Sequence, residues 1–214
     1  MILTTARLTL VPPAERHIPA YTAFLASPRA AARGWQALPH EAWRHFAAIL
    51  GHGILRGFGP FVAEERGTGR ALGLFGPWWP EGQPEREVKW TLFDAADEGR
   101  GYALEAARAC LSHVFGPLGW AGAVSYITPD NARSAALAQR LGAVQDGTWT
   151  TPPAGTKPPS PGQPAPKGTT APGRNVKRVS MPPPTRVVPL ATPTEPVPYT
   201  RETEPIDVVV PRKL

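Results

Sequence analysis

Two glycines in the stretch Glu98–Ala103 stand where a backbone could hold an anionic ligand. The stretch reads Glu-Gly-Arg-Gly-Tyr-Ala; an apolar run at residues 88–93 precedes it, and helix-spaced apolar residues follow it. Glycine allows positive φ and a close approach of the backbone to a ligand. The first N–H groups of a helix have no partner within the helix and favour an anion. The stretch therefore predicts a phosphate-binding turn between a strand and a helix.

A second group of polar residues follows the next predicted strand, residues 123–128. Asp130 or Asn131 is a good N-cap for a helix over residues 132–141, and Ser134 falls in the first turn of that helix. A capping asparagine and an ordinary first-turn serine would explain these residues without any ligand. A cap can also contact a ligand, so both interpretations stay open.

Both segments resemble motifs of the GNAT superfamily of N-acetyltransferases. Glu98-x-x-Gly101-x-Ala103 is similar to the diphosphate-binding motif Gln/Arg-x-x-Gly-x-Gly/Ala, from which it departs at the first position. Asn131-x-x-Ser134, followed by a helix that ends in Leu-Gly, resembles a second motif of the family. The Thr-x-Arg-Leu-x-Leu opening at residues 5–10 resembles the RimJ/RimL-type branch, which acetylates amino groups with acetyl-CoA.

The resemblance implies an N-acetyltransferase that transfers an acetyl group from acetyl-CoA, its co-substrate, to a primary amine. The acceptor could be a protein N-terminus or a small-molecule amine. A backbone amide near Trp90–Leu92 would stabilise the developing oxyanion, and Ser134 would protonate the leaving CoA thiolate. The residues implied to bind the cofactor are Trp90, Leu92, Gly99, Arg100, Gly101, Tyr102, Ala103 and Asn131.

Two acidic residues need separate interpretation. Glu87 begins the strand before the glycine turn, and we expect it to act as a base for the amine or to orient it. The alternative is an exposed strand residue. Glu98 is unfavourable beside a diphosphate unless it points to solvent, so backbone amides would carry most of the binding.

Hydrophobic periodicity predicts the strand and the two helices at the start of the chain that would help to position these residues. Residues 7–11 alternate as a strand, residues 14–25 form a helix whose start Pro19 shifts, and Pro39 opens a second helix. The apolar stripe of that second helix is Trp43, Phe46, Ala47 and Leu50. We expect Trp35, Trp43 and Phe46 to lie in the core; the alternative, which the resemblance implies, is that they border the acceptor-substrate site.

Residues 61–65 and 71–75 flank a glycine-containing turn and predict a hairpin. Trp78 and Trp79 lie between prolines and should not continue a central strand; they would line a pocket or cap the sheet. The order of strands and helices is that of the GNAT fold. The predicted fold class is α/β (α+β), a mixed central sheet flanked by helices.

Composition changes near residue 150. The last 65 residues contain 17 of the 28 prolines, and the excess of basic over acidic residues is 1 in residues 1–149 and 5 in residues 150–214. Such a segment cannot bury enough apolar surface to fold alone. We expect a GNAT domain over 1–149 and a disordered, Pro-rich, basic tail over 150–214. Val144–Thr150 and Val208–Val210 are the candidates for the final strands. The tail would then be a long insertion, a replaced domain end or the product of a shifted reading frame.

The remaining sequence features bear on disulfides, localisation, metal binding and partners. The single cysteine, Cys110, excludes an intrachain disulfide framework and reads as a small core residue. No signal peptide or membrane-spanning run is evident, so we expect a cytoplasmic protein. The five histidines lack metal-ligand spacing, and we expect no metal. We expect a monomer or homodimer that does not bind membranes or, given the near-neutral first part, nucleic acid.

Two alternative functions remain. The chain could be a non-catalytic, regulatory acyl-CoA-binding domain, which Glu98 and the unusual C-terminal end favour. It could instead be an interaction protein that acts through its tail. Pro158–Pro161 and Pro193–Pro196 have PxxP spacing, and Lys177-Arg178 could contact an acidic surface.

Overall fold

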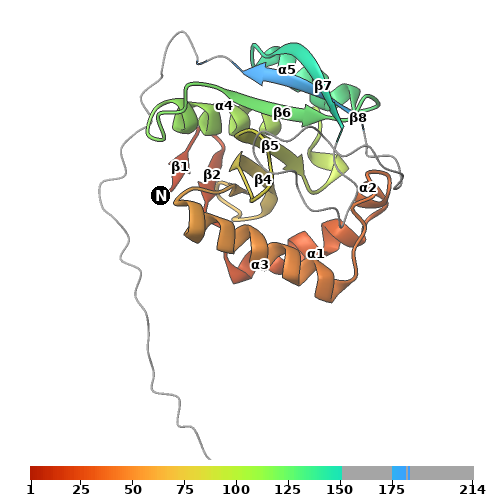
Figure 1. Ribbon diagram of the computed structural model, residues 1–214. Helices are drawn as coiled ribbons and strands as arrows, with labels where there is room; N and C mark the ends of the chain where they lie inside the picture. Colours follow the sequence, from red (N-terminus) through yellow and green to blue (C-terminus); the bar gives the residue numbers. More distant parts are fainter. Residues whose placement is uncertain (151–174, 182, 184–214) are drawn as a thin grey trace, which may run out of the picture.

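A mixed β-sheet forms the centre of the computed structural model, which describes residues 1–150, 175–181 and 183 (Figure 1). Within these residues there is one eight-stranded sheet, in the order β1-β2-β3-β4-β5-β6-β8-β7. Neighbouring strands are antiparallel, except for the parallel pair β5 and β6. The strands are β1 (Leu3–Thr4), β2 (Leu8–Val11), β3 (Phe61–Glu65), β4 (Ala71–Trp78), β5 (Glu87–Leu92), β6 (Ala123–Ile127), β7 (Val144–Thr150) and β8 (Asn175–Met181).

Helices cover both faces of the sheet, which confirms the predicted fold class (Figure 1). On one face, α4 packs against β1, β2, β4 and β5, and Cys110 is fully buried in this core, as predicted. On the other face, α1 and α3 pack together around a second core that includes Leu74. The helices are α1 (Ile18–Ala26), α2 (Pro28–Ala31), α3 (Pro39–Arg56), α4 (Tyr102–Phe115) and α5 (Ala132–Arg140), with 3-10 turns η1 (Glu15–His17) and η2 (Ala95–Asp97).

The face that α3 buries differs from the predicted stripe. Phe46 is in the core, as predicted. Trp43 is 55% exposed and Trp35 is 48% exposed, so the prediction that these two tryptophans lie in the core was wrong. The buried row of α3 contains Ala42, Phe46 and Ile49. Trp43 lies one position beyond this row, which turns its ring by about 100° around the helix axis.

Strand β4 is longer than predicted. It continues through Pro77 to Trp78, which pairs with Glu87 of β5, so the prediction that the proline would end the strand was wrong. The register between β3 and β4 ends at Phe61 opposite Phe75. Beyond that point β4 has an open edge on the β3 side, where a residue without an N–H breaks no ladder.

The C-terminal end brings the largest correction. The sequence predicts a disordered tail over residues 150–214, but Asn175–Met181 form β8, which pairs with both β6 and β7. Val176, Val179 and Met181 are buried there. Strand β8 was not predicted, because its seven residues stand within a much longer proline-rich sequence. The rest of that range, and the candidate strand Val208–Val210, lie outside the described residues.

Arg178 of β8 has partners within the sheet. Its guanidinium donates to Glu85 at 2.6 Å and forms an ion pair with Asp146 at 2.6 Å. This pairing leaves Arg178 committed to the fold, contrary to the alternative in which Lys177-Arg178 contacts an acidic partner. The two PxxP segments lie outside the described residues. No helix in the described part of the chain is long and apolar enough to cross a membrane.

Candidate active site

The glycine turn lies at the start of α4, as predicted. Gly99 and Gly101 have φ of 73° and 81°, and Gly101 is the N-cap of the helix. A side chain at either position would be strained in this left-handed region. Gly99, Gly101 and Ala103 line a cleft of about 370 Å³. The turn therefore presents backbone N–H groups of a 14-residue helix to a cavity.

Residues between β1 and β2 hold the glycine turn in place. Arg7 Nη1 donates to the Arg100 carbonyl at 2.8 Å, and Arg7 Nε donates to Glu105 Oε2 at 2.7 Å. Thr5 donates to the same carboxylate at 2.6 Å. The Thr-x-Arg opening of the sequence thus fixes the conformation of a loop far along the chain.

The parallel strands β5 and β6 diverge beside this turn. In the described part of the chain they pair at one register position, Glu87 opposite Val124. Further along, Tyr126 N donates to the Glu87 carboxylate at 3.4 Å, and the Ser125 hydroxyl donates to the Val88 carbonyl. Side chains thus take the place of the backbone ladder.

The gap between the strands exposes the edge of β5. Phe93 N donates to the Leu72 carbonyl at 2.9 Å. The backbone N–H and C=O groups of the odd-numbered residues of β5 therefore point toward β4. Hydrogen-bonding direction alternates along a strand, so the backbone N–H of Trp90 points toward the gap. Trp90 and Leu92, two of the residues that the resemblance implies for cofactor binding, line the cleft.

Asn131 and Ser134 form a hydrogen-bonded pair at the start of α5. Asn131 is the N-cap: its Oδ1 accepts from Ser134 N at 3.2 Å, and its Nδ2 donates to Ser134 Oγ at 2.8 Å. Arg33 Nη2 also donates to Asn131 Oδ1, at 3.1 Å. Both residues line the cleft and a larger neighbouring cavity, so the cap faces a space that could hold a ligand.

The larger cavity has a volume of about 990 Å³ and is rich in aromatic side chains. Glu87 lines it but is only 5% exposed, so the exposed-residue alternative was wrong. Burial raises the pKa of Glu87, and the charge of Lys89 and the hydrogen bond from Gln83 oppose this rise. A carboxylate with a raised pKa inside a cavity is suited to proton transfer.

A tyrosine–histidine pair in this cavity was not foreseen. Tyr21 OH and His45 Nδ1 lie 2.7 Å apart, and both residues line the cavity. Burial and the charge of Lys89 lower the pKa of His45, which favours the neutral imidazole. His45 carried no sequence signal, because a single histidine on a helix has no diagnostic spacing.

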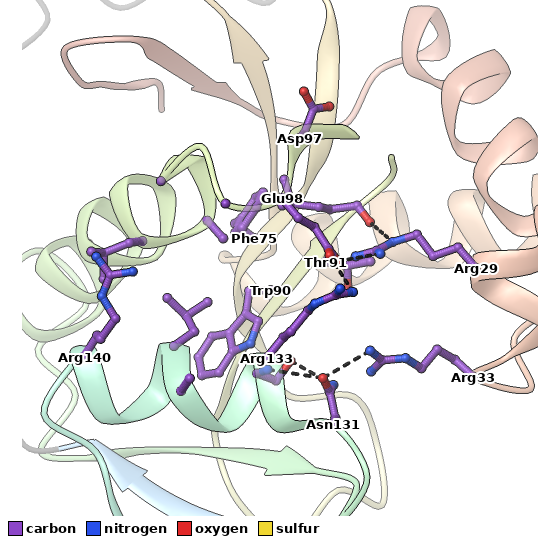
Figure 2. Close-up of a pocket in the computed structure, with 18 of the residues that line it drawn as sticks. Arg29, Arg33, Phe75, Trp90, Thr91, Asp97, Glu98, Asn131, Arg133 and Arg140 are labelled. Atoms are coloured by element: carbon purple, nitrogen blue, oxygen red, sulfur yellow. Dashed lines mark hydrogen bonds and ion pairs between the residues drawn. The ribbon is translucent and has the colours of Figure 1, made fainter. Parts of the chain in front are cut away.

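Glu98 does not point to solvent but forms two ion pairs beside the glycine turn. Its side chain is 18% exposed, and its two oxygens pair with Arg29 Nη1 at 2.5 Å and Arg133 Nη1 at 2.6 Å. Figure 2 shows Arg29 from α2 and Arg133 from α5 directed at this one carboxylate. The acid is thus neutralised, which removes one reason for preferring a non-catalytic domain. Sequence spacing gave no sign that these arginines would meet Glu98.

Arg100 and Tyr102 have side chains directed elsewhere than the cleft. The Tyr102 hydroxyl donates to Glu65 at 2.5 Å, and the Arg100 guanidinium lies over the Tyr102 ring at 4.9 Å. Any contact of these two residues with a ligand in the cleft would come from their backbone. Among the residues that the structure describes, no cluster of His, Cys, Asp and Glu could hold a metal ion.

Comparison with known proteins agrees with this geometry. A family model described as an acetyltransferase (GNAT) domain matches residues 7–144. The crystal structure of an acetyltransferase from Agrobacterium tumefaciens is 35% identical, over 83% of this chain and 93% of that one, with a TM-score of 0.65. The structure of a protein from Bordetella pertussis that is named a putative GNAT-family acetyltransferase is 22% identical. The match covers 85% of this chain and 99% of that one, with a TM-score of 0.65. At that identity only the fold is shown.

Two further similarities are more limited. The uncharacterised protein YkkB of Bacillus subtilis is 36% identical over 84 residues, which is 38% of this chain and 48% of YkkB. The match thus spans about half the length of that curated relative. A ribosomal L7/L12 alpha-N-protein acetyltransferase, RimL, solved in complex with coenzyme A, is 15% identical over 85% of this chain and 98% of that one, with a TM-score of 0.62.

Proposed function

Because the chain belongs to the GNAT family of acetyltransferases, we propose that it transfers the acetyl group of acetyl-CoA to a primary amine. The observation that carries this proposal is the convergence of three features on one cleft. These are the glycine turn at the start of α4, the open edge of β5, and the Asn131–Ser134 pair. The cleft would hold the donor, and the larger cavity that shares Ser134 with it would hold the amine.

The diphosphate of acetyl-CoA would lie over Gly99 and Gly101, where the helix N-terminus favours negative charge. The acyl arm would then enter the gap between β5 and β6. The Trp90 N–H points into this gap and would donate to the thioester oxygen. Such a donor becomes more effective as negative charge develops on the oxygen in the transition state.

Glu87 would take a proton from the protonated amine, directly or through water. The freed amine attacks the thioester carbon, a C–N bond forms, and the C–S bond then breaks. The electron pair leaves on sulfur as a thiolate. The attacking nitrogen, now positively charged, loses its second proton to water, because Glu87 already carries the first, and the neutral amide results.

Ser134 would protonate the departing thiolate and take a proton back from water. Its Oγ accepts from Asn131 Nδ2, so its own O–H is left to donate toward the sulfur. Asn131 would thus orient the proton donor while it caps the helix. The RimJ/RimL-type branch is our proposal for the place of this chain within the family, supported by the role of Thr5 and Arg7 under the turn.

The test is acetyl-CoA turnover against a panel of amines: peptides with free N-termini, amino acids, polyamines and arylalkylamines. Gly99→Glu should abolish CoA binding in calorimetry, because it places a like charge beside the diphosphate. Gly119→Glu is the matched control, since Gly119 also has positive φ (61° against 73°) and an added Cβ meets nothing within 4 Å at either site. Equal CoA affinity in the two variants would refute the assignment of the turn.

A further inference from the structure

Glu98 and its two arginines form a charged bridge in the lining of the cleft. Arg29 donates from Nε to the Leu92 carbonyl at 3.1 Å, and its Nη1 forms an ion pair with Glu98. Arg133 reaches the other carboxylate oxygen from α5 and is 76% exposed. All three residues line the cleft beside the glycine turn. One acid thus connects an arginine of α2 with an arginine of α5.

The charges of this bridge sum to +1, since one carboxylate faces two guanidinium groups. Each guanidinium carries five N–H donors in a planar fork that matches a phosphate. Among the described residues, neither Arg29 Nη2 nor Arg133 Nη2 has a hydrogen-bond partner. The bridge therefore offers positive charge and unused donors to an anion in the cleft.

We propose that Glu98 is a positioning residue that holds Arg29 and Arg133 against the diphosphate of acyl-CoA. The arginines supply the positive charge that the first position of the motif lacks in this chain. The inference rests on the proposed function, because it assumes that the cleft binds CoA. It adds that the acid, although close to the diphosphate, strengthens binding through the groups it orients.

The test is calorimetry with CoA on a double-mutant cycle. Arg133→Ala and Arg29→Ala should each weaken binding by about tenfold, the effect of one charge-assisted hydrogen bond. Arg44→Ala, which removes an exposed helix arginine outside both cavities, should leave affinity unchanged. Arg133→Lys, which keeps the charge but not the fork, should recover part of the loss.

Glu98→Ala gives the decisive readout. In the parent chain it should weaken CoA binding by several-fold, because the arginines lose their anchor. In the Arg29→Ala/Arg133→Ala background it should tighten binding, because only the repulsion of the acid remains there. A merely structural role for Glu98 would not reverse the sign. Tighter binding by Glu98→Ala in the parent chain would overturn the proposal.

The ligand series separates the diphosphate from other groups. The arginine effects should persist with dephospho-CoA, which keeps the diphosphate, and vanish with pantetheine, which has no phosphate. Loss of the effects with dephospho-CoA would assign the arginines to the 3′-phosphate and refute the inference. A parent chain that binds no CoA would refute the proposed function itself. Arg29→Ala and Arg133→Ala variants that bind as tightly as the parent would refute only the bridge.

Discussion

Ser134 is the residue whose proposed role is most directly measurable. Ser134→Ala removes the proton donor but leaves the cleft open, so kcat should fall by at least about tenfold, the lower end of general-acid effects. The dissociation constant of CoA should hardly change, since the hydroxyl acts mainly in the transition state. Single-turnover kinetics and calorimetry give the two values.

Ser112→Ala in α4 is the matched control for this variant, because Ser112 lines neither cavity. An unchanged single-turnover rate for Ser134→Ala would remove the serine from the mechanism. Tyr126 of β6 would then be the next donor to test.

Glu87 should determine the acidic limb of the pH–rate profile. Burial raises its pKa above the ordinary value for glutamate, so kcat/KM should fall as pH decreases through this raised pKa. Glu87→Gln cannot titrate and should flatten that limb while it lowers the plateau. An unaltered limb in the variant would mean that another group accepts the proton.

The same burial makes a prediction for stability. A carboxyl whose pKa is higher in the folded state than in the unfolded state stabilises fully below the unfolded pKa. This stabilisation is lost as pH rises through the raised folded pKa. The melting temperature of Glu87→Gln minus that of the parent should therefore increase from pH 4 to pH 8. A difference that stays constant with pH would show that burial does not perturb Glu87.

Single residues were predictable from the sequence where their role is local. Gly99, Gly101 and Asn131 were identified because a helix start needs glycine and a capping side chain at fixed positions. Arg29 and Arg133 were missed, because their meeting at Glu98 depends on how α2 and α5 lie across the cleft. No spacing along the chain encodes that meeting.

At the level of elements, the site depends on an irregularity between β3 and β4. The register shifts there, between Ala63 and Glu64, and Leu72 is the extra residue of β4. The next residue, Gly73, lies so close to β5 that an added Cβ would meet the Thr91 carbonyl at 2.1 Å. Thr91 lines both cavities, so this packing sets the position of the edge of β5 that faces the gap.

Gly73→Ala should therefore displace β5. We expect a destabilisation of about 1–3 kcal/mol, typical of overpacking, together with a lower kcat. Urea unfolding and steady-state kinetics measure the two effects. Gly122→Ala is the control, since its Cβ would meet nothing within 4 Å. Parent-like behaviour of Gly73→Ala would mean that β4 and β5 can separate without affecting the site.

Elements with strong periodicity were predicted well, and the errors have physical causes. The glycine turn, α4 and α5 follow from spacing and capping alone. The prediction for Trp43 was wrong because α3 has two adjacent apolar rows, and only packing decides which row is buried. The end of β4 was predicted too early. A proline is tolerated where β3 no longer pairs with β4, and where that pairing ends depends on the tertiary structure.

For the molecule as a whole, we expect the folded unit to extend past residue 149 to β8. A chain ending at Thr150 would leave the open edge of β6 unpaired and detach β7 from the sheet. It should lose cooperative thermal unfolding and CoA binding. A chain ending at residue 183 keeps β8 and should match the full chain in both measurements. A stable, CoA-binding chain that ends at Thr150 would contradict this.

The position of β8 between β6 and β7 has a consequence for how the chain folds during synthesis. β7 leaves the ribosome before β8, yet in the native sheet its neighbour is β8. Strand β8 must be made, and Asn175 must reach Thr150, before β6 finds its correct partner. Until then a direct β6–β7 pairing competes with the native arrangement as a kinetic trap. We therefore expect the gap between β5 and β6 to be among the last parts of the molecule to reach its native structure.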